Sequence, residues 1–571
     1  MTNHKPTLFL FMRRFKSIID YATDDVIIRL LAKERGKYVS QKTGKQQCQS
    51  QDKQDIWGQL QNIMPPRSIW RNPGKRRRPT SGNNLHGIAL WTRKKRLGAT
   101  RVHVTILREL QRGSQDTWAI ELRKFIDRIH GYLDGSIKLK FESPTIIAKF
   151  KEQDPDTGHF IYRPICKYTN LETKILLALA YNYLLYCFDD CFHRNMLFMR
   201  SARRTNQGWK TPNYLDAIRM TDQYRERNKD KLIFVGECDI QKFYDIFNHD
   251  DILDCFEELF KVKKERQDDL NDEDFDPIRR IVRAYLESYD YANKVMVLND
   301  TPAFWSAEKR IHANADNPDP VCRFKWVSEK SFVESRCYKS KEEFIQARDE
   351  GKIGIPQGGA LSGIIVNVVM NVIDRGMVEP QDTDRLFVRY CDDILLMHTD
   401  RRKCEQYLDY YVNALTMHKL VPHKLVHVSQ MKNGFKTASG FWHAKSKHVF
   451  LWGHGMNDSS DWVGFVGFEM RRTGEIRVRK DKVNSEAKRI AKTYYSVIKS
   501  NTPEERINSF NSLAGHFKDY ELISYNRYTV AQAKRLDNYL KLKVKQACKK
   551  RGVDEPAELK TYYDTLVDMA K

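Results

Sequence analysis

The feature that most limits how this chain folds is a pair of short apolar runs on either side of Cys391-Asp392-Asp393. Residues 386–390 read Leu-Phe-Val-Arg-Tyr, and residues 394–397 read Ile-Leu-Leu-Met. Two short apolar runs joined by a tight turn predict a β-hairpin, here with adjacent carboxylates at its tip. Because adjacent carboxylates repel, a site that keeps both ionised generally supplies a cation. The alternative is that Asp-Asp serves only as turn chemistry, and the isolated string does not distinguish the two.

A third carboxylate ends another apolar strand. Residues 232–235 read Leu-Ile-Phe-Val, and Asp239 follows four residues later. A carboxylate at the end of a buried strand is either an ion-pair partner or a metal ligand. Taken alone, Asp239 fits a structural carboxylate better than a ligand. The aromatic residues Phe243 and Tyr244 come shortly after it.

Between these two elements lies a glycine-rich loop, Gly354-Ile355-Pro356-Gln357-Gly358-Gly359. The apolar stretch 363–372 follows, and it predicts a helix that Ser362 caps. Glycines let the backbone approach a nucleotide or base pair closely, and Gln357 can form a hydrogen bond there. A lone glycine-rich loop would mean little, so the value of this one lies in its position between the acidic elements.

The charge of the chain indicates a polyanionic partner. It carries 98 Lys and Arg against 74 Asp and Glu, a formal net charge of +24, and residues 66–101 hold eleven basic residues and no acidic one. Basic side chains neutralise phosphates and aromatic faces stack on unpaired bases, so this segment predicts a nucleic-acid contact. A solvated basic loop is the alternative. The candidate contacts are Trp70, Arg76, Arg77, Arg78, Trp91, Arg93, Lys94, Lys95 and Arg96.

Size and composition favour a globular, cytoplasmic protein. The chain has 571 residues, of which 41% are apolar and 30% charged, a balance typical of globular and not of disordered chains. The longest apolar runs are too short to cross a bilayer, and the N-terminus lacks the layout of a signal peptide. The eleven cysteines include no Cys-x-x-Cys pair, which favours free thiols in a reducing cytosol over a zinc site.

The order of the three elements decides between the alternatives left open above. An Asp-ended strand, a Gly-x-Pro-Gln-Gly loop with its helix, and a Tyr-x-Asp-Asp hairpin follow one another. This set resembles the reverse transcriptase family, whose motifs A, B and C match here as Asp239–Asp245, Gly354–Asn367 and Tyr390–Asp393. Weaker similarities, to a fingers motif, the end of the following helix, motif D and the primer-grip hairpin, lie at 162–165, 197–200, 418–424 and 462–474.

The resemblance implies an α+β fold, the right-hand polymerase with fingers, a palm of antiparallel sheet plus helices, and a helical thumb. Residues 1–135 are expected to form a helical and basic N-terminal extension, and residues 136–230 the fingers. The palm is expected at 231–480, with an insertion at about 295–350. Residues 481–571 are expected to form a helical, thumb-like region.

The resemblance also implies two-metal transfer of dNTPs to a primer 3′-hydroxyl. The expected cofactor is a pair of Mg²⁺ ions, for which Mn²⁺ can substitute. Their expected ligands are Asp239, Asp392, Asp393 and the carbonyl of Ile240. Lys424 is the expected proton donor to the leaving pyrophosphate.

Other residues are expected to bind the incoming nucleotide. Tyr244 takes the position of the family's sugar gate, where an aromatic ring leaves little room for a 2′-hydroxyl and so favours dNTPs. An RNA-dependent RNA polymerase, a sister class, predicts a small polar residue there, and Tyr244 disfavours it. The expected nucleotide contacts are Arg163, Ile240, Phe243, Tyr244, Gln357 and Gly358.

The motif set resembles bacterial enzymes, and the long N-terminal extension is most similar to the defence-associated, abortive-infection branch. A group II intron or retron-type enzyme, and a maturase-like RNA-binding protein with little polymerase activity, are the alternatives. The implied partners are an RNA template in the form of a structured non-coding RNA, a DNA product and dNTPs. A homo-oligomer or a partner protein stays open, and no membrane is expected.

Overall fold

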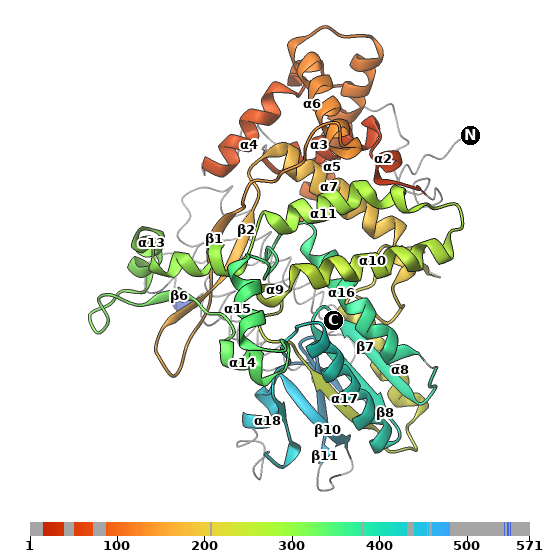
Figure 1. Cartoon of the computed structure of the whole chain (residues 1–571), viewed down its shortest axis with the longest axis vertical. Helices are drawn as coiled ribbons and strands as arrows, with labels where there is room; N and C mark the ends of the chain where they lie inside the picture. Colours follow the sequence, from red (N-terminus) through yellow and green to blue (C-terminus); the bar gives the residue numbers. More distant parts are fainter. Residues whose placement is uncertain are drawn as a thin grey trace. The chain divides into compact units, whose positions relative to one another are not determined.

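The computed structural model describes residues 15–38, 51–71, 87–205, 208–379, 381–430, 439–453, 455 and 459–479, together with 542, 545, 546 and 549. Within these residues the chain is α+β, as predicted (Figure 1). It divides into two compact units. The first comprises Met1–Gly74, Gly98–Ala217 and Gly236–Val449, and the second comprises Lys75–Leu97, Ile218–Val235 and Phe450–Lys571. No helix in these described ranges is long and apolar enough to span a membrane.

The three aspartates lie on a sheet with the strand order β11-β10-β5-β8-β7, in which β9 also pairs with β10. Its strands are β5 (Phe234–Cys238), β7 (Arg385–Tyr390), β8 (Asp393–His398), β9 (Leu425–Val426), β10 (Ser446–Trp452) and β11 (Ser459–Ser460). β7 and β8 form the predicted antiparallel hairpin. Strands β9 and β11 run parallel to β10, so the sheet is mixed where an antiparallel one was expected. A crossover through α18 (Ser439–His443) joins β9 to β10, and a crossover gives parallel pairing.

Two helices border the β7–β8 hairpin in the sequence, one ending before β7 and the other beginning after β8. The apolar run after the glycine-rich loop forms α16 (Ser362–Val378), which is buried along most of its length because it packs between α10 (His249–Arg266) and α17 (Arg401–Met417). α17 begins directly after β8 and packs against it, as Figure 1 shows beside β7 and β8. The sequence predicted this helix, and its burial on most sides suits a helix that is largely apolar around its circumference.

A second sheet contains the expected fingers motif. β1 (Thr145–Gln153) pairs antiparallel with β2 (Phe160–Lys167), and β6 (Cys322–Phe324) adds to β2 in parallel. β6 comes from the expected insertion at 295–350, whose helices are α13 (Pro302–His312), α14 (Glu329–Glu334) and α15 (Lys341–Asp349). Trp305 and Phe324 from this segment share one buried cluster with Tyr162 of β2. The segment is therefore part of this sheet's core.

The described residues of the expected N-terminal extension are mainly helical. Its helices are α2 (Ile18–Tyr21), α3 (Asp24–Tyr38), α4 (Gln51–Asn62), α5 (Gly87–Gln111) and α6 (Thr117–Asp134). α2, α3, α4 and α6 all pack against α7 (Leu171–Cys187), which explains why α7 is apolar on nearly every side. Further elements are β3 (Arg203–Thr205), β4 (Gly208–Lys210), α8 (Tyr214–Arg227), α9 (Phe243–Ile246), α11 (Asp276–Glu287) and α12 (Tyr291–Lys294).

The described part of the second unit contains the hairpin expected at 462–474. β12 (Trp462–Phe465) and β13 (Phe468–Arg471) pair antiparallel, and β14 (Ile476–Val478) pairs with β13. The turn residues Val466 and Gly467 both have positive φ, at 42° and 89°, as a two-residue hairpin loop requires. The expected thumb-like region, 481–571, lies outside the described residues apart from four positions.

Candidate active site

The turn between β7 and β8 carries two of the three predicted carboxylates. Cys391 and Asp392 form the turn, and Asp393 begins β8 opposite Tyr390. Cys391 has a positive φ of 62°, the backbone conformation that closes such a short loop. Burial, followed by the charge of Asp239, raises the pKa of Asp392, and burial with the charges of Asp392 and Asp239 raises that of Asp393. The three carboxylates are therefore close enough to repel one another.

Asp239 follows the last residue of β5, the strand next to β8, and is 4% exposed. Its backbone N–H donates to Ser446 Oγ at 2.9 Å. Its carboxylate is held at both oxygens, because Oδ1 accepts from the Ile240 N–H at 2.9 Å and Oδ2 accepts from Lys445 Nζ at 2.8 Å. Strand pairing and these bonds fix Asp239 beside the turn.

Two lysines next to Asp239 were not predicted as site residues. Lys445 immediately precedes β10, and Lys447 lies on β10, where its buried ammonium pairs with Glu237 of β5. Glu237 Oε1 is buried and has no hydrogen-bond partner in the part of the chain that the structure describes. A signal did exist in the sequence. Glu237 and Asp239 are two residues apart, as are the two lysines, and alternate residues of a strand share a face.

The segment expected to be motif D runs beside Asp239. The Gln241 N–H donates to the Val421 carbonyl at 2.8 Å, and the His423 N–H donates to the Asp239 carbonyl at 2.9 Å. Ile240 pairs with Pro422 between these two bonds, so its own carbonyl takes part in neither. Lys424 follows directly and is exposed. The segment that contains Lys424 therefore lies beside Asp239. The Ile240 carbonyl takes no part in the backbone hydrogen bonds between the two segments.

Tyr244 connects the Asp239 segment to the turn that carries Asp392. It lies on α9, and its hydroxyl is 3.6 Å from Cys391 Sγ. The half-buried ring therefore stands beside the turn, at the position expected for a sugar gate. Phe243, also predicted as a nucleotide contact, is 4% exposed and packs its ring 4.8 Å from that of Phe247. Phe243 therefore lies in the hydrophobic core, on the same helix as Tyr244.

The glycine-rich loop is bonded to the Asp239 segment on one side and to β2 on the other. Gly354 and Ile355 donate their N–H groups to the carbonyls of Phe247 and Tyr244 at 2.7 and 2.8 Å. The Gln357 carbonyl accepts from the Cys166 N–H at 2.8 Å. The Gln357 side chain is half-buried and Gly358 is exposed.

Close packing explains why one position in this loop is glycine. A Cβ on Gly359 would lie 1.9 Å from the Tyr285 hydroxyl. The predicted cap by Ser362 is wrong, because Leu361 already has helical φ and ψ and Ser362 is the first residue of α16. The Ser362 hydroxyl instead donates to the Pro356 carbonyl at 2.5 Å and lies 2.8 Å from the Tyr285 hydroxyl. It closes the loop and does not cap the helix.

Arg163 lies on β2 next to the strand residues that hold the glycine-rich loop. It is exposed and pairs in register with Lys149 of β1, which is exposed as well. Two cationic side chains at neighbouring positions of one hairpin form a local positive surface, which suits an anionic ligand. Lys149 was not singled out from the sequence.

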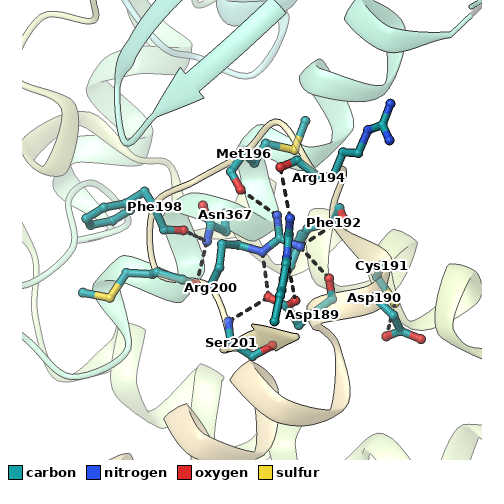
Figure 2. Close-up of polar contacts among 12 residues, drawn as sticks. Asp189, Asp190, Cys191, Phe192, Arg194, Met196, Phe198, Arg200, Ser201 and Asn367 are labelled. Atoms are coloured by element: carbon teal, nitrogen blue, oxygen red, sulfur yellow. Dashed lines mark hydrogen bonds and ion pairs between the residues drawn. The ribbon is translucent and has the colours of Figure 1, made fainter. Parts of the chain in front are cut away.

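A buried arginine organises the loop that precedes β3. Figure 2 shows the Arg200 guanidinium at its centre, where it donates to Asp189 Oδ1 at 2.6 Å and to four backbone carbonyls. A guanidinium offers five N–H donors, so one side chain can hold an irregular loop closed. The carbonyls are those of Asp189, Phe192, His193 and Met196.

Asn367 joins this loop to the turn that carries Asp392. From α16 its amide donates to the carbonyls of Phe198 and Met199 at 2.7 and 3.2 Å (Figure 2). Its Oδ1 accepts from the Arg389 guanidinium at 3.4 Å, and Arg389 Nη1 donates to the Cys391 carbonyl at 2.9 Å. A continuous set of hydrogen bonds therefore runs from the Arg200 loop to the residue before Asp392.

The predicted nucleic-acid segment is only partly described. Arg76, Arg77 and Arg78 lie outside the described residues, while Trp91 and residues 93–96 lie on α5, so part of the segment is helical. Trp70 is half-buried, with the Arg35 guanidinium 4.3 Å from its ring centroid. One face of that ring is therefore already stacked, and base stacking by Trp70 stays a prediction.

Residues 323–460 match the family model described as Reverse transcriptase (RNA-dependent DNA polymerase). The matched segment contains the glycine-rich loop and the turn with Asp392 and Asp393, whereas Asp239 precedes it. The chain therefore carries a reverse transcriptase domain and is a nucleotidyltransferase of the RNA-directed DNA polymerase class. None of the curated proteins is a match.

Similar solved structures include two telomerases of the genus Candida. The apo telomerase of Candida tropicalis has 13% identity and a TM-score of 0.32, over 93% of this chain and 81% of that chain. The telomerase of Candida albicans in complex with a TWJ fragment of telomeric RNA has 12% identity and a TM-score of 0.27, over 84% and 71%. Scores this low indicate a distant likeness, which carries no argument about activity or partners.

Proposed function

We propose that Asp239, Asp392 and Asp393 hold two Mg²⁺ ions with which the chain adds dNTPs to a primer 3′-hydroxyl on an RNA template. The observation that carries this proposal is that Asp239 directly follows β5, while Asp392 and Asp393 lie at the start of the neighbouring strand β8. Oxygen donors of this kind suit Mg²⁺, and Mn²⁺ is expected to substitute. Burial, and after it the charges of the neighbouring carboxylates, raises the pKa of Asp392 and Asp393, and a divalent cation relieves that repulsion.

When bound, the ions would lower the pKa of the primer hydroxyl and neutralise charge on the triphosphate. The chain's own residues position this chemistry. Lys445 and the Ile240 N–H orient the two oxygens of Asp239, and the Ile240 carbonyl is free of the bridge to Pro422 and can add an oxygen ligand. Arg389 holds the Cys391 carbonyl and thereby the turn.

The remaining predicted residues surround the nucleotide in this proposal. Arg163 of β2 contributes positive charge toward the phosphates, and Lys424 protonates the leaving pyrophosphate. Tyr244 excludes a 2′-hydroxyl, while Gln357 and Gly358 present the glycine-rich loop to the base pair. The contact of Tyr244 with Cys391 and its backbone bond to Ile355 support this arrangement, because they tie all three motifs together.

The proposal is tested by Asp392→Asn and Asp393→Asn, which keep the shape of the side chain and remove its charge. We expect incorporation of radiolabelled dNTP into primer–template to fall by at least about a thousandfold, because amides are poor ligands for Mg²⁺. Binding of nucleic acid should persist. The matched control is Asp409→Asn, an exposed aspartate on α17, which should retain full activity. Full synthesis by either active-site variant would contradict the metal assignment.

The same assay separates the proposal from a maturase-like protein, which would bind RNA and incorporate nothing.

We further propose a structured non-coding RNA as template and a role in bacterial antiphage defence in the cytoplasm. The net charge of +24 supports a nucleic-acid partner. The defence role rests on the similarity of the long N-terminal extension to the defence-associated branch. Sequencing RNA that purifies with the protein tests the partner. Phage plating efficiency on bacteria that express wild type or Asp392→Asn tests the role.

A further inference from the structure

A cluster outside the catalytic carboxylates gathers three kinds of metal-ligating side chain. Asp251 and Cys255 lie one turn apart on α10, so they share one face of that helix, and His418 follows the last residue of α17. His418 Nδ1 lies 3.0 Å from Asp251 Oδ1 and 3.8 Å from Cys255 Sγ. The three ligand atoms all lie within 4.8 Å of one another.

We propose that Asp251, Cys255 and His418 bind a borderline-soft divalent cation, with Zn²⁺ as the best fit. Zn²⁺ takes sulfur, imidazole nitrogen and carboxylate oxygen, whereas Mg²⁺ demands oxygen. Tetrahedral Zn²⁺, with bonds of about 2.0–2.3 Å, sets its ligand atoms roughly 3.3–3.6 Å apart. The observed 3.0 and 3.8 Å are within a few tenths of an ångström of that spacing.

The exposure of the three side chains suits a site with an open fourth position. The side chains of Asp251 and His418 are 16% and 20% exposed, and Cys255 is 2% exposed. The buried cysteine can therefore bind a cation from the protein interior, and water can take the fourth coordination position on the exposed side. Three protein ligands plus water is a common arrangement of Zn²⁺.

An ion pair between Asp251 and His418 accounts for only part of this geometry. Nδ1 carries at most one hydrogen, so as a donor to Asp251 it leaves Cys255 Sγ unexplained. A cation between Asp251, Cys255 and His418 is a partner that all three ligand atoms can share, since they lie within 4.8 Å of one another.

The location gives such a site a structural consequence. His418 begins segment 418–424, whose His423 N–H is bonded to the Asp239 carbonyl. A cation on His418 would tie the start of this segment to α10. The site itself requires nothing from the polymerase chemistry proposed above, so the two proposals can fail separately.

Cobalt binding to the full-length chain, freed of any purification tag, tests the site. We expect Co²⁺ added in the presence of excess Mg²⁺ to give tetrahedral d–d absorption together with sulfur-to-cobalt charge transfer, and Zn²⁺ to displace both. Charge transfer needs a thiolate ligand, which Co²⁺ held by the oxygens of the three aspartates alone lacks. Asp392→Asn should therefore keep the whole signature.

Variants decide the assignment. Cys255→Ser should abolish the charge-transfer band, and His418→Gln and Asp251→Asn should each weaken Co²⁺ binding by at least about tenfold, the loss that even an indirect partner of a metal ligand typically causes. Cys187→Ser, at a half-buried cysteine of α7, is the matched control and should bind as wild type does. Added Zn²⁺ should raise the melting temperature of wild type and control only.

Absence of charge transfer in the wild type, or its persistence in Cys255→Ser, overturns the proposal and leaves an ion pair beside a free thiol. If Cys255→Ser does not fold, His418→Gln and Asp251→Asn carry the test. Wild-type Co²⁺ affinity in both of these variants would then overturn the proposal as well.

Discussion

Replacing Arg389 with methionine should destabilise the protein by about 3–5 kcal/mol, the usual cost of removing one partner from a buried ion pair. Arg389 and Asp374 are both fully buried, with Nη2 and Oδ2 2.7 Å apart. Methionine fills much of the volume but leaves the Asp374 carboxylate unpaired. Asp374 Oδ1 already has no hydrogen-bond partner among the described residues, so no nearby donor replaces the guanidinium.

Hydrogen exchange of the β7, β8 and α16 amides measures this loss, because a chain with two compact units gives no single unfolding free energy. A loss of about 3–5 kcal/mol corresponds to a fall in protection of about two to nearly four orders of magnitude. Burial raises the pKa of Asp374 above its ordinary value. A carboxyl group whose pKa is higher in the folded than in the unfolded chain lowers stability only at a pH above its unfolded pKa, where it would ionise. The loss should therefore shrink as the pH falls toward about 3.9 and grow above it.

A double variant separates packing from function. Arg389→Met with Asp374→Leu removes both buried charges and should recover most of the protection. DNA synthesis should stay low, because the Cys391 carbonyl still lacks its donor. Lys330→Met, from an exposed pair with Glu334, is the control and should change stability by less than about 0.5 kcal/mol. A single variant with wild-type protection, or a double variant that regains synthesis, would refute the reasoning.

Three further outcomes are expected. Tyr244→Ala should raise the rNTP/dNTP ratio of kcat/KM by about tenfold or more, a change of about 1.4 kcal/mol, and an unchanged ratio rules out the gate. Gly359→Ala should lower the melting temperature and cost about 1–3 kcal/mol through its clash with the Tyr285 hydroxyl, and adding Tyr285→Phe should restore part of it. Neutralising the basic segment should weaken RNA binding and flatten its log–log dependence on salt by roughly 0.7 for each phosphate that is no longer neutralised, whereas a wild-type slope would leave only a solvated loop. The glutamine substitutions are at Arg76, Arg77, Arg78, Arg93, Lys94, Lys95 and Arg96.

Local patterns in the sequence predicted the elements around the site. Alternation and apolar runs depend on neighbours in the chain, which is why the β7–β8 hairpin and α16 could be located before the structure was known. The Ser362 cap failed for a tertiary reason. Leu361 is already helical, and the Ser362 hydroxyl finds the Pro356 carbonyl and Tyr285 close by. A capping rule that considers only neighbouring residues in the chain does not include these other partners of the Ser362 hydroxyl.

The sequence by itself determined the class of chemistry, because the order of Asp239, the glycine-rich loop and the Asp-Asp turn contains the elements that a polymerase site needs. Only the tertiary structure decided the ionic partners. Among 98 basic and 74 acidic residues, composition does not say that Lys445 holds Asp239 or that Arg389 is buried against Asp374. Lys445 and Asp239 are far apart in the chain, and the order of strands in the sheet brings their charges together. Arg389 of β7 and Asp374 of α16 meet because that helix lies beside that strand. Coulomb energy depends on that separation and on burial, and neither is a property of the sequence read locally.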